Sequence, residues 1–268
     1  MLAWKNDSRL VVDGVDFVLA PTTPNHARGA VDAGSLLLRK PRWMVERYAA
    51  LEVPAGPNVF ELGIYEGGST ALLSLLLRPR RLVAIDLRPS RTSALDDFIT
   101  ARGLREHVRP YYGVDQTDRA RLSDLIAAEF GAEPLDLVID DASHLLDETT
   151  ASFNALFPRL RPGALFVIED WSWQHFRDEA LEEKLRSDPV ALEALTRRLE
   201  AGPAVRKDPL SRLVLELVLT AGYAEEIVAE VTSARRGWLV VRRGEAPLDP
   251  VTFDISTCYG SLGRALLP

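Results

Sequence analysis

The chain has 268 residues, enough for one large α/β domain with a full hydrophobic core. Its formal net charge of -7 argues against nucleic-acid binding, because phosphate recognition usually needs an excess of basic residues. A single cysteine excludes an internal disulfide, and no apolar run approaches the roughly 20 residues that span a bilayer. With no basic, apolar leader at the N-terminus, we expect a cytoplasmic protein that contacts neither membrane nor nucleic acid.

The first part of the chain predicts a small β extension. Two β-rich runs flank Asp13-Gly14, which predicts a hairpin over 9–19. The stretch 21–34 is rich in Pro, Thr, Asn and Gly and is typical of a loop, and a helix is expected over 42–51. We therefore divide the chain into an N-terminal β-hairpin extension over 1–35 and a main domain over 36–268.

From residue 58 onward, short apolar runs alternate with helical patterns. Strands are predicted over 58–62, 81–85, 108–112, 135–139 and 163–168, and helices over 70–77, 94–102, 119–130 and 148–157. Alternation at this spacing predicts parallel βαβ units.

The last third of the chain breaks this rhythm. Residues 174–222 predict a helical insertion or lid, with helices over 181–186, 190–199 and 212–219. Two further strands, 226–232 and 237–243, are joined by a connection too short for a crossover helix, so they must be antiparallel. Five parallel strands followed by an antiparallel hairpin is the order of the Rossmann-like class I methyltransferase sheet. A dinucleotide-binding dehydrogenase would continue with a parallel strand.

A glycine-rich turn joins the first strand of the sheet to its helix. The segment from Glu61 to Thr70 reads ELGIYEGGST, in which Gly63 and Gly67 permit a tight turn and close approach of a ligand. Ser69 and Thr70 are candidate caps of the helix that follows. An acidic residue at the strand end suits a cationic ligand such as S-adenosylmethionine, with its sulfonium and ammonium groups, better than a pyrophosphate.

Polar residues end the next two strands as well. Asp86 stands where a carboxylate accepts hydrogen bonds from a ribose diol, and Asp115 or Gln116 are placed to contact an adenine edge. These residues favour S-adenosylmethionine, with NAD as the alternative ligand. The remaining interpretation is that they are only turn glycines and caps.

Two carboxylate pairs end the fourth and fifth strands. Asp140-Asp141 and Glu169-Asp170 fall at the carboxyl ends of neighbouring strands, the edge at which open α/β sheets bind ligands. Carboxylates that converge repel one another unless a cation binds them, and Mg²⁺ is the simplest choice. His144 follows closely, and a histidine with an ordinary pKa of about 6.5 can take a proton from a hydroxyl that a metal has acidified. The alternatives are that Asp141 or Ser143 caps a helix and that Glu169-Asp170 is a solvated loop.

These segments resemble a known family. Glu61–Thr70, Asp140–His144 and Glu169-Asp170-Trp171 are similar to the metal-dependent sugar O-methyltransferases of macrolide and related antibiotic biosynthesis, including mycinamicin and rhamnosyl O-methyltransferases. The same core is shared with proteins labelled cephalosporin hydroxylases. The resemblance covers residues 36–172. Ala142 stands where that family's Asp-Asp-Gly-Ser-His form has glycine.

The resemblance implies a set of roles for individual residues. Asp141, Glu169 and Asp170 would bind Mg²⁺, and His144 would be the general base. The cofactor site would include Glu61, Gly63, Ser69, Asp86 and Asp115, with Asp140 close to the methionine portion of S-adenosylmethionine. Members of the family often form oligomers, so we expect a homo-oligomer.

The function predicted from the sequence is Mg²⁺- and S-adenosylmethionine-dependent O-methylation of a sugar hydroxyl on a glycosylated natural product. A small aromatic or polyketide hydroxyl is an alternative acceptor, because neighbouring oxygens chelate a metal equally well in either compound. A second alternative is a catalytically silent subunit that binds S-adenosylmethionine and supports a partner. The intact set of Asp141, His144, Glu169 and Asp170 argues against it.

Overall fold

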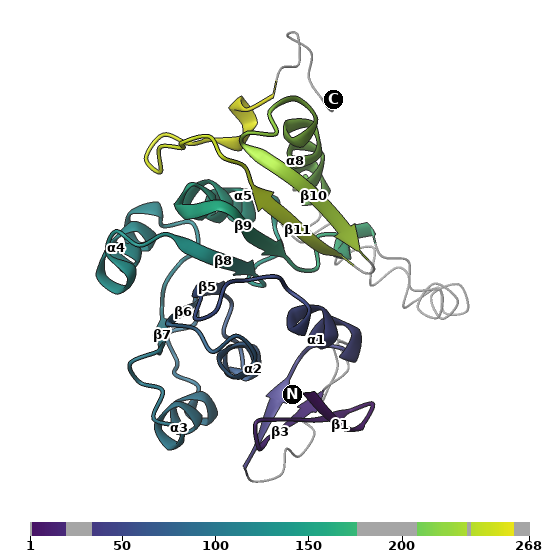
Figure 1. The fold of residues 1–268 in the computed structure, drawn as a ribbon, viewed down its shortest axis with the longest axis vertical. Helices are drawn as coiled ribbons and strands as arrows, with labels where there is room; N and C mark the ends of the chain where they lie inside the picture. The colour runs from purple at the N-terminus through teal and green to yellow at the C-terminus, as the bar shows by residue number, and fades with distance from the viewer. Residues whose placement is uncertain (1, 20–33, 176–207, 235–236, 260–268) are drawn as a thin grey trace, which may run out of the picture.

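The computed structural model describes residues 2–19, 34–175, 208–234 and 237–259, and its main body is a three-layer α/β/α sandwich (Figure 1). A seven-stranded sheet lies in the middle, with the strand order β10-β11-β9-β8-β5-β6-β7. The strands are β5 (Asn58–Leu62), β6 (Arg81–Asp86), β7 (Val108–Tyr112), β8 (Leu135–Asp140), β9 (Leu160–Ile168), β10 (Val228–Ala234) and β11 (Trp238–Arg243). The expected fold class, a Rossmann-like sheet of the class I methyltransferase type, is confirmed.

The direction of the strands agrees with the sequence prediction. Strands β5 to β9 pair in parallel, whereas β11 runs antiparallel to both β9 and β10. Every residue of β5 is buried, as expected for a central strand with both faces covered. The carboxyl ends of β5, β6, β8 and β9 therefore meet at one edge of the sheet.

Helices cover both faces of the sheet. One face carries α4 (Arg119–Phe130), α5 (Leu146–Leu156) and α8 (Ser211–Tyr223), and the other carries α1 (Arg42–Ala49), α2 (Gly68–Leu77) and α3 (Ser93–Ala101) (Figure 1). Each set of helices packs its apolar side chains against the sheet and forms a hydrophobic core on its own face. Short 3-10 turns are η1 (Phe157–Arg159), η2 (Trp173–His175) and η4 (Ile255–Thr257).

The N-terminal segment forms a second sheet with the order β1-β2-β3-β4. The hairpin expected around Asp13-Gly14 is present, with β2 (Arg9–Val12) antiparallel to β3 (Val15–Leu19) and positive φ angles of 49° and 79° at the two turn residues. The structure adds two strands that the sequence did not predict: β1 (Leu2–Asn6), and β4 (Ser35–Leu38), which pairs in parallel with β3. Because β4 includes residue 35, this sheet crosses the boundary expected between residues 35 and 36.

Several predicted elements cannot be compared with the structure. The loop over 21–34 and the helices over 181–186 and 190–199 lie almost entirely outside the described residues. The helix expected over 212–219 is present as α8, and the two last strands are present as β10 and β11. Among the described residues, no helix is both long enough and apolar enough to cross a membrane.

Candidate active site at the carboxyl edge of the sheet

Four neighbouring strands end in acidic residues at the same edge of the sheet. The register pairs Leu62 of β5 with Asp140 of β8, and Asp140 with Ile168 of β9, so Glu61, Asp140 and Glu169 come from adjacent strands. All three side chains are at most 2% exposed. Burying this many carboxylates is costly unless cations or hydrogen-bond donors meet them, so the partners of each one indicate what the edge can bind.

The glycine-rich turn lies directly against this edge. Gly63 has a φ of 99°, and a Cβ there would come within 2.3 Å of the Asp141 carbonyl oxygen, so only glycine fits. Gly67 is the N-cap of α2 with a left-handed backbone, and the helix has no side-chain cap. The expected capping by Ser69 or Thr70 is therefore wrong, because the Thr70 hydroxyl donates to Glu61 Oε2 at 2.6 Å instead.

Glu61 is a buried carboxylate with one oxygen to spare. Its Oε1 has no hydrogen-bond partner in the described structure, and its side chain is fully buried. Burial raises the pKa of Glu61 to about 7, although the hydroxyls of Ser69 and Thr70 and the charge of Lys40 oppose the rise. A buried carboxylate with an unused oxygen is suited to a cationic group of a ligand.

Asp86 ends β6 on the other side of the turn. Its Oδ2 accepts hydrogen bonds from the backbone N–H groups of Ile64 and Tyr65 at 3.2 and 2.7 Å, and Arg88 contacts both carboxylate oxygens. Burial alone would raise the pKa of Asp86, but the hydrogen bonds from Arg88 and Tyr65 outweigh it and lower the pKa. Asp86 thus remains charged beside the glycine-rich turn, as its predicted ribose contact requires.

Asp140 and Gln116 belong to one buried network. Ser152 on α5 donates to Asp140 Oδ2 at 2.6 Å, and Gln116 Nε2 lies 3.4 Å from the same oxygen. Gln116 Oε1 also accepts from the backbone N–H of Ser143. Burial raises the pKa of Asp140 above its usual value. Asp115, the other candidate for an adenine contact, is exposed and accepts from the backbone and hydroxyl of Thr117.

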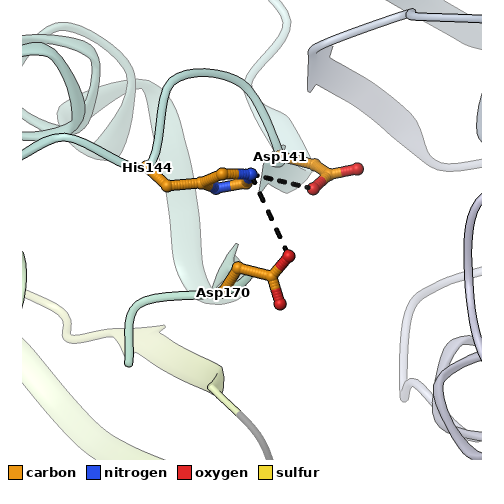
Figure 2. Close-up of side chains that lie close together, drawn as sticks. All are labelled: Asp141, His144 and Asp170. Carbon is orange, nitrogen blue, oxygen red and sulfur yellow. Dashed lines mark ion pairs between the residues drawn. The ribbon is translucent and has the colours of Figure 1, made fainter. Parts of the chain in front are cut away.

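Figure 2 shows a second group, in which Asp141, His144 and Asp170 converge from the loops after β8 and β9. His144 Nε2 lies 3.8 Å from Asp141 Oδ1 and 4.0 Å from Asp170 Oδ2. One ligand atom from each residue falls within 4.8 Å of the others, a spacing at which a single metal ion could bind them. Helix α5 begins with Leu145 as its N-cap and no side-chain cap, so the alternative that Asp141 caps this helix is wrong.

The backbone around this group is strained. His144 and Asp170 have φ angles of 55° and 52°, in the left-handed region that residues other than glycine rarely adopt. The turn before β11 supports Asp170, because Gly237 approaches it so closely that a Cβ would lie 3.0 Å from the Asp170 Cα. Trp173 Nε1 donates to the His144 carbonyl oxygen at 2.8 Å. Strain that neighbouring groups hold in place is typical of functional sites.

Glu169 is turned toward two residues that the sequence did not single out. Both of its oxygens accept hydrogen bonds from Lys40 Nζ, at 2.7 and 2.8 Å, and Oε1 also accepts from the Tyr48 hydroxyl. Lys40 Nζ lies 2.8 Å from Asp141 Oδ2 as well. Burial and the charge of Asp141 raise the pKa of Glu169 although Lys40 opposes them. With Glu169 only 2% exposed, the solvated-loop alternative is wrong for this residue.

No local signal in the sequence identifies Lys40 and Tyr48 as partners of this edge. Lys40 follows the short strand β4, and Tyr48 lies on the buried side of α1. They are 101 to 129 residues from the carboxylates that they contact. A lysine two residues after an apolar run is the nearest hint, because its burial would require acidic partners.

The central part of the chain is similar to a known family of proteins. Residues 60–171 match the methyltransferase domain family, and this stretch includes both groups of the candidate site. The demethylmacrocin O-methyltransferase of Streptomyces fradiae is 51% identical over 65 residues, which are 23% of this chain and 16% of that protein. The 8-demethyl-8-alpha-L-rhamnosyl tetracenomycin-C 2'-O-methyltransferase of Streptomyces olivaceus is 50% identical over 56 residues, which are 21% of this chain and 14% of that protein. The matches thus span less than one fifth of the length of these relatives.

Solved structures agree on the fold. The O-methyltransferase TomG from Streptomyces achromogenes, solved in complex with S-adenosylmethionine, superposes with a TM-score of 0.50 at 19% identity. The superposition covers 77% of this chain and 82% of that one. At this identity the likeness establishes the architecture of the sheet and its helices, whereas the ligands depend on the residues described above.

Proposed function

We propose that this protein is an S-adenosylmethionine- and Mg²⁺-dependent O-methyltransferase that acts on a sugar hydroxyl of a glycosylated natural product. The observation that carries the proposal is the group formed by Asp141, His144 and Asp170 at the carboxyl edge of the sheet. It places a potential base beside two carboxylates, next to a glycine-rich turn that follows Glu61, whose buried Oε1 has no hydrogen-bond partner.

The methyl donor fits the first group of residues. Glu61 offers an unpartnered, buried oxygen to the ammonium or sulfonium end of S-adenosylmethionine. Asp86 is the proposed partner of the ribose diol, which would replace the Arg88 side chain on its oxygens, and Gly63 and Gly67 have the positive φ angles that the tight turn requires. NAD suits this arrangement less well, because its pyrophosphate would meet Glu61 instead of a cationic group.

The residues present also fit a divalent cation. Asp141 and Asp170 point their oxygens toward the space in front of His144, and carboxylate oxygens are the ligands that Mg²⁺ prefers. Glu169 is the third oxygen donor of the proposed set. A carboxylate has about four acceptor positions, and Lys40 and Tyr48 use three of those on Glu169. When bound, the ion would polarise the acceptor's hydroxyl group and lower its pKa.

His144 is the proposed general base. Its Nε2 faces Asp141 Oδ1 and Asp170 Oδ2, on the side where the proposed ion and the acceptor hydroxyl would lie. The tryptophan contact to its carbonyl oxygen and the left-handed backbone fix the place from which the ring projects. His144 takes the hydroxyl proton at Nε2, and the acceptor oxygen then forms a bond to the methyl carbon as the sulfonium–methyl bond breaks.

The acceptor class rests on the relatives. One is named for a rhamnosyl tetracenomycin and the other for demethylmacrocin, and each is about half identical to a segment of this chain. Two neighbouring oxygens on a sugar would suit a single ion held by carboxylates. An aromatic diol would place its oxygens similarly, so the two acceptor classes become separate arms of the test.

The test is transfer of a labelled methyl group from S-adenosylmethionine to a panel of rhamnosylated and other deoxysugar-bearing polyketides, with simple catechols alongside. We expect label on a glycoside in the presence of Mg²⁺, no label with EDTA, and recovery when Mg²⁺ is added back. Transfer that is insensitive to EDTA would refute the metal, and transfer to catechols alone would refute the sugar. Binding of S-adenosylmethionine with no turnover on any acceptor, restored by a partner protein, would support the silent-subunit alternative instead.

A further inference from the structure

The candidate active site includes a buried cation that belongs to the protein. Lys40 Nζ lies 2.8 Å from Asp141 Oδ2 and 2.7 and 2.8 Å from the two oxygens of Glu169. An ammonium group has three hydrogens, so these contacts use every donor that Lys40 has. The side chain is 3% exposed, and it comes from the segment between β4 and α1, outside the matched methyltransferase domain.

This contact divides the two oxygens of Asp141 between two tasks. Oδ2 accepts from Lys40, whereas Oδ1 faces His144 Nε2 at 3.8 Å and belongs to the group with Asp170. A carboxylate held at one oxygen presents the other in a fixed direction. Within the described residues, the hydrogen bond from Lys40 is the only one to the Asp141 side chain, so without Lys40 nothing there would fix its rotation.

The same lysine holds Glu169 in place. Glu169 has its two oxygens on Lys40, and Tyr48, on the helix that follows Lys40 in the chain, donates to Oε1. Tyr48 is fully buried and packs edge-on against Trp238 at a centroid distance of 4.9 Å, so it cannot easily move to replace the lysine. Loss of the ammonium group would leave a 2% exposed carboxylate without its cation.

The N-terminal segment also packs closely against the end of the glycine-rich turn. A Cβ on Gly68 would lie only 2.0 Å from the Leu37 carbonyl oxygen, so β4 presses directly on the start of α2. One short stretch, from Leu37 to Tyr48, therefore touches both halves of the candidate site. This favours an integral role of the stretch in the site over that of a separable extension.

We propose that Lys40 is a positioning residue that orients Asp141 and Glu169 for the divalent cation. The inference rests on the proposed metal site and adds a residue that acts on its ligands without touching the substrate. Partners that orient metal ligands typically contribute about 10- to 100-fold to metal affinity. Coulomb's law acts in the opposite direction, because a positive charge this close repels the ion, so the sign of the effect decides between positioning and competition.

The experiment is a titration with Mn²⁺, followed by electron paramagnetic resonance, on the full chain and three variants. Lys40→Met removes the ammonium and keeps the length of the side chain, and Lys40→Arg keeps the charge. Lys5→Met is the matched control, because Lys5 also pairs with a carboxylate, Asp16, in the N-terminal sheet, far along the chain from the site. Binding of S-adenosylhomocysteine, measured by calorimetry, reports whether each variant keeps the cofactor site.

We expect Lys40→Met to weaken Mn²⁺ binding by about 10-fold or more, Lys40→Arg to retain more affinity than Lys40→Met, and Lys5→Met to bind like the unaltered chain. Unchanged or tighter binding of Mn²⁺ by Lys40→Met would overturn the positioning role and leave the proposed metal site intact. Failure of the unaltered chain to bind Mn²⁺, with S-adenosylhomocysteine still bound, would instead overturn the metal site and this proposal with it.

A measurement on the unaltered chain covers the case in which Lys40→Met does not fold. A buried, fully hydrogen-bonded ammonium group exchanges slowly with water, so its ¹⁵N resonance can be observed and assigned by its absence in Lys40→Arg. We expect Mg²⁺ to shift this resonance along a saturating titration curve. A resonance that stays unchanged while Mg²⁺ binds would overturn the proposal.

Discussion

Substitution of Glu61 by glutamine should remove a loss of stability that grows between about pH 5 and about pH 8, and should weaken binding of S-adenosylmethionine. The Glu61 side chain is fully buried, and burial raises its pKa from 4.5 to about 7. Since the folded protein holds this proton more tightly than the unfolded chain, stability is greatest below pH 4.5 and falls as the pH rises toward 7. Glutamine keeps the shape of the side chain and has no proton to lose.

The size of the effect follows from the two pKa values. A difference of about 2.5 pKa units corresponds to about 3 kcal/mol of stability, lost in full at about pH 8 and by only about 1 kcal/mol at about pH 5. The amide nitrogen of glutamine would stand where Glu61 Oε1 has no partner, and an unpaired buried donor costs about 1–3 kcal/mol, the same at every pH. The diagnostic quantity is therefore the change with pH, about 2 kcal/mol in favour of Glu61→Gln between those two conditions.

The assay is urea unfolding of both proteins at about pH 5 and about pH 8, without ligand. Comparison with the unaltered chain removes the contributions of Asp140, Asp170 and Glu169, because these residues are present in both proteins. Calorimetry should show S-adenosylmethionine binding weakened by about 2 kcal/mol, or about 30-fold, because a hydrogen bond to a charged group is lost. A stability difference that stays constant with pH would refute the pKa argument, and unchanged binding would refute the contact with the cofactor.

Three further substitutions test other parts of the site. His144→Ala should lower single-turnover methyl transfer by about 10²- to 10⁴-fold and leave S-adenosylhomocysteine binding unchanged; full activity would refute the base. In urea unfolding, Gly103→Ala should lower the free energy of unfolding by about 1 kcal/mol, and Gly63→Ala should lower it several times more. Both glycines have a positive φ, but only at Gly63 would a Cβ collide with a backbone oxygen. Equal losses in the two variants would refute the collision. Asp86→Asn should destabilise the protein at pH 7 and less at about pH 3, because the lowered pKa of Asp86 stabilises the fold only while it is charged; a thermal melt with no such pH dependence would contradict this.

The central sheet could be predicted because its evidence is local. Buried parallel strands such as β5 are short apolar runs, and the pattern changes to a helical period within each βαβ unit. The direction of β10 and β11 followed from the length of their connection. The acidic residues at the strand ends could be predicted for the same reason. The carboxyl ends of parallel strands lie at one edge of the sheet, so a residue that ends a strand in the sequence lies at that edge in the fold.

The N-terminal sheet could be predicted only in part. Its hairpin has a strong turn signal, but β1 (Leu2–Asn6) is an edge strand with two charged or polar residues in five, and β4 (Ser35–Leu38) has only four residues. The partner of β4 is β3, and 15 residues of sequence lie between the end of β3 and the start of β4. The sequence of either strand gives no sign that it pairs in parallel with the other across such a gap.

The partners of the carboxylates were beyond the sequence for a similar reason. Thr70 was expected to cap a helix and instead donates to Glu61, because a glycine in a left-handed conformation already begins α2. Lys40 and Tyr48 contact Glu169 although they lie 129 and 121 residues before it in the sequence. Local patterns in the sequence show which strand end carries a carboxylate. Its protonation and orientation depend on partners that are distant in the sequence and come close to it only in the folded protein.

The carboxyl edge of the sheet is where this fold gives up stability for binding. Burial raises the pKa values of Glu61, Asp140 and Glu169, so keeping each of these carboxylates charged costs stability. Of these three, only Glu169 has a cation among the described residues within hydrogen-bond distance, while Glu61 keeps an oxygen without a partner. A ligand that brings positive charge to this edge would recover part of that cost, and both proposed ligands do so: a sulfonium methyl donor and a divalent metal ion.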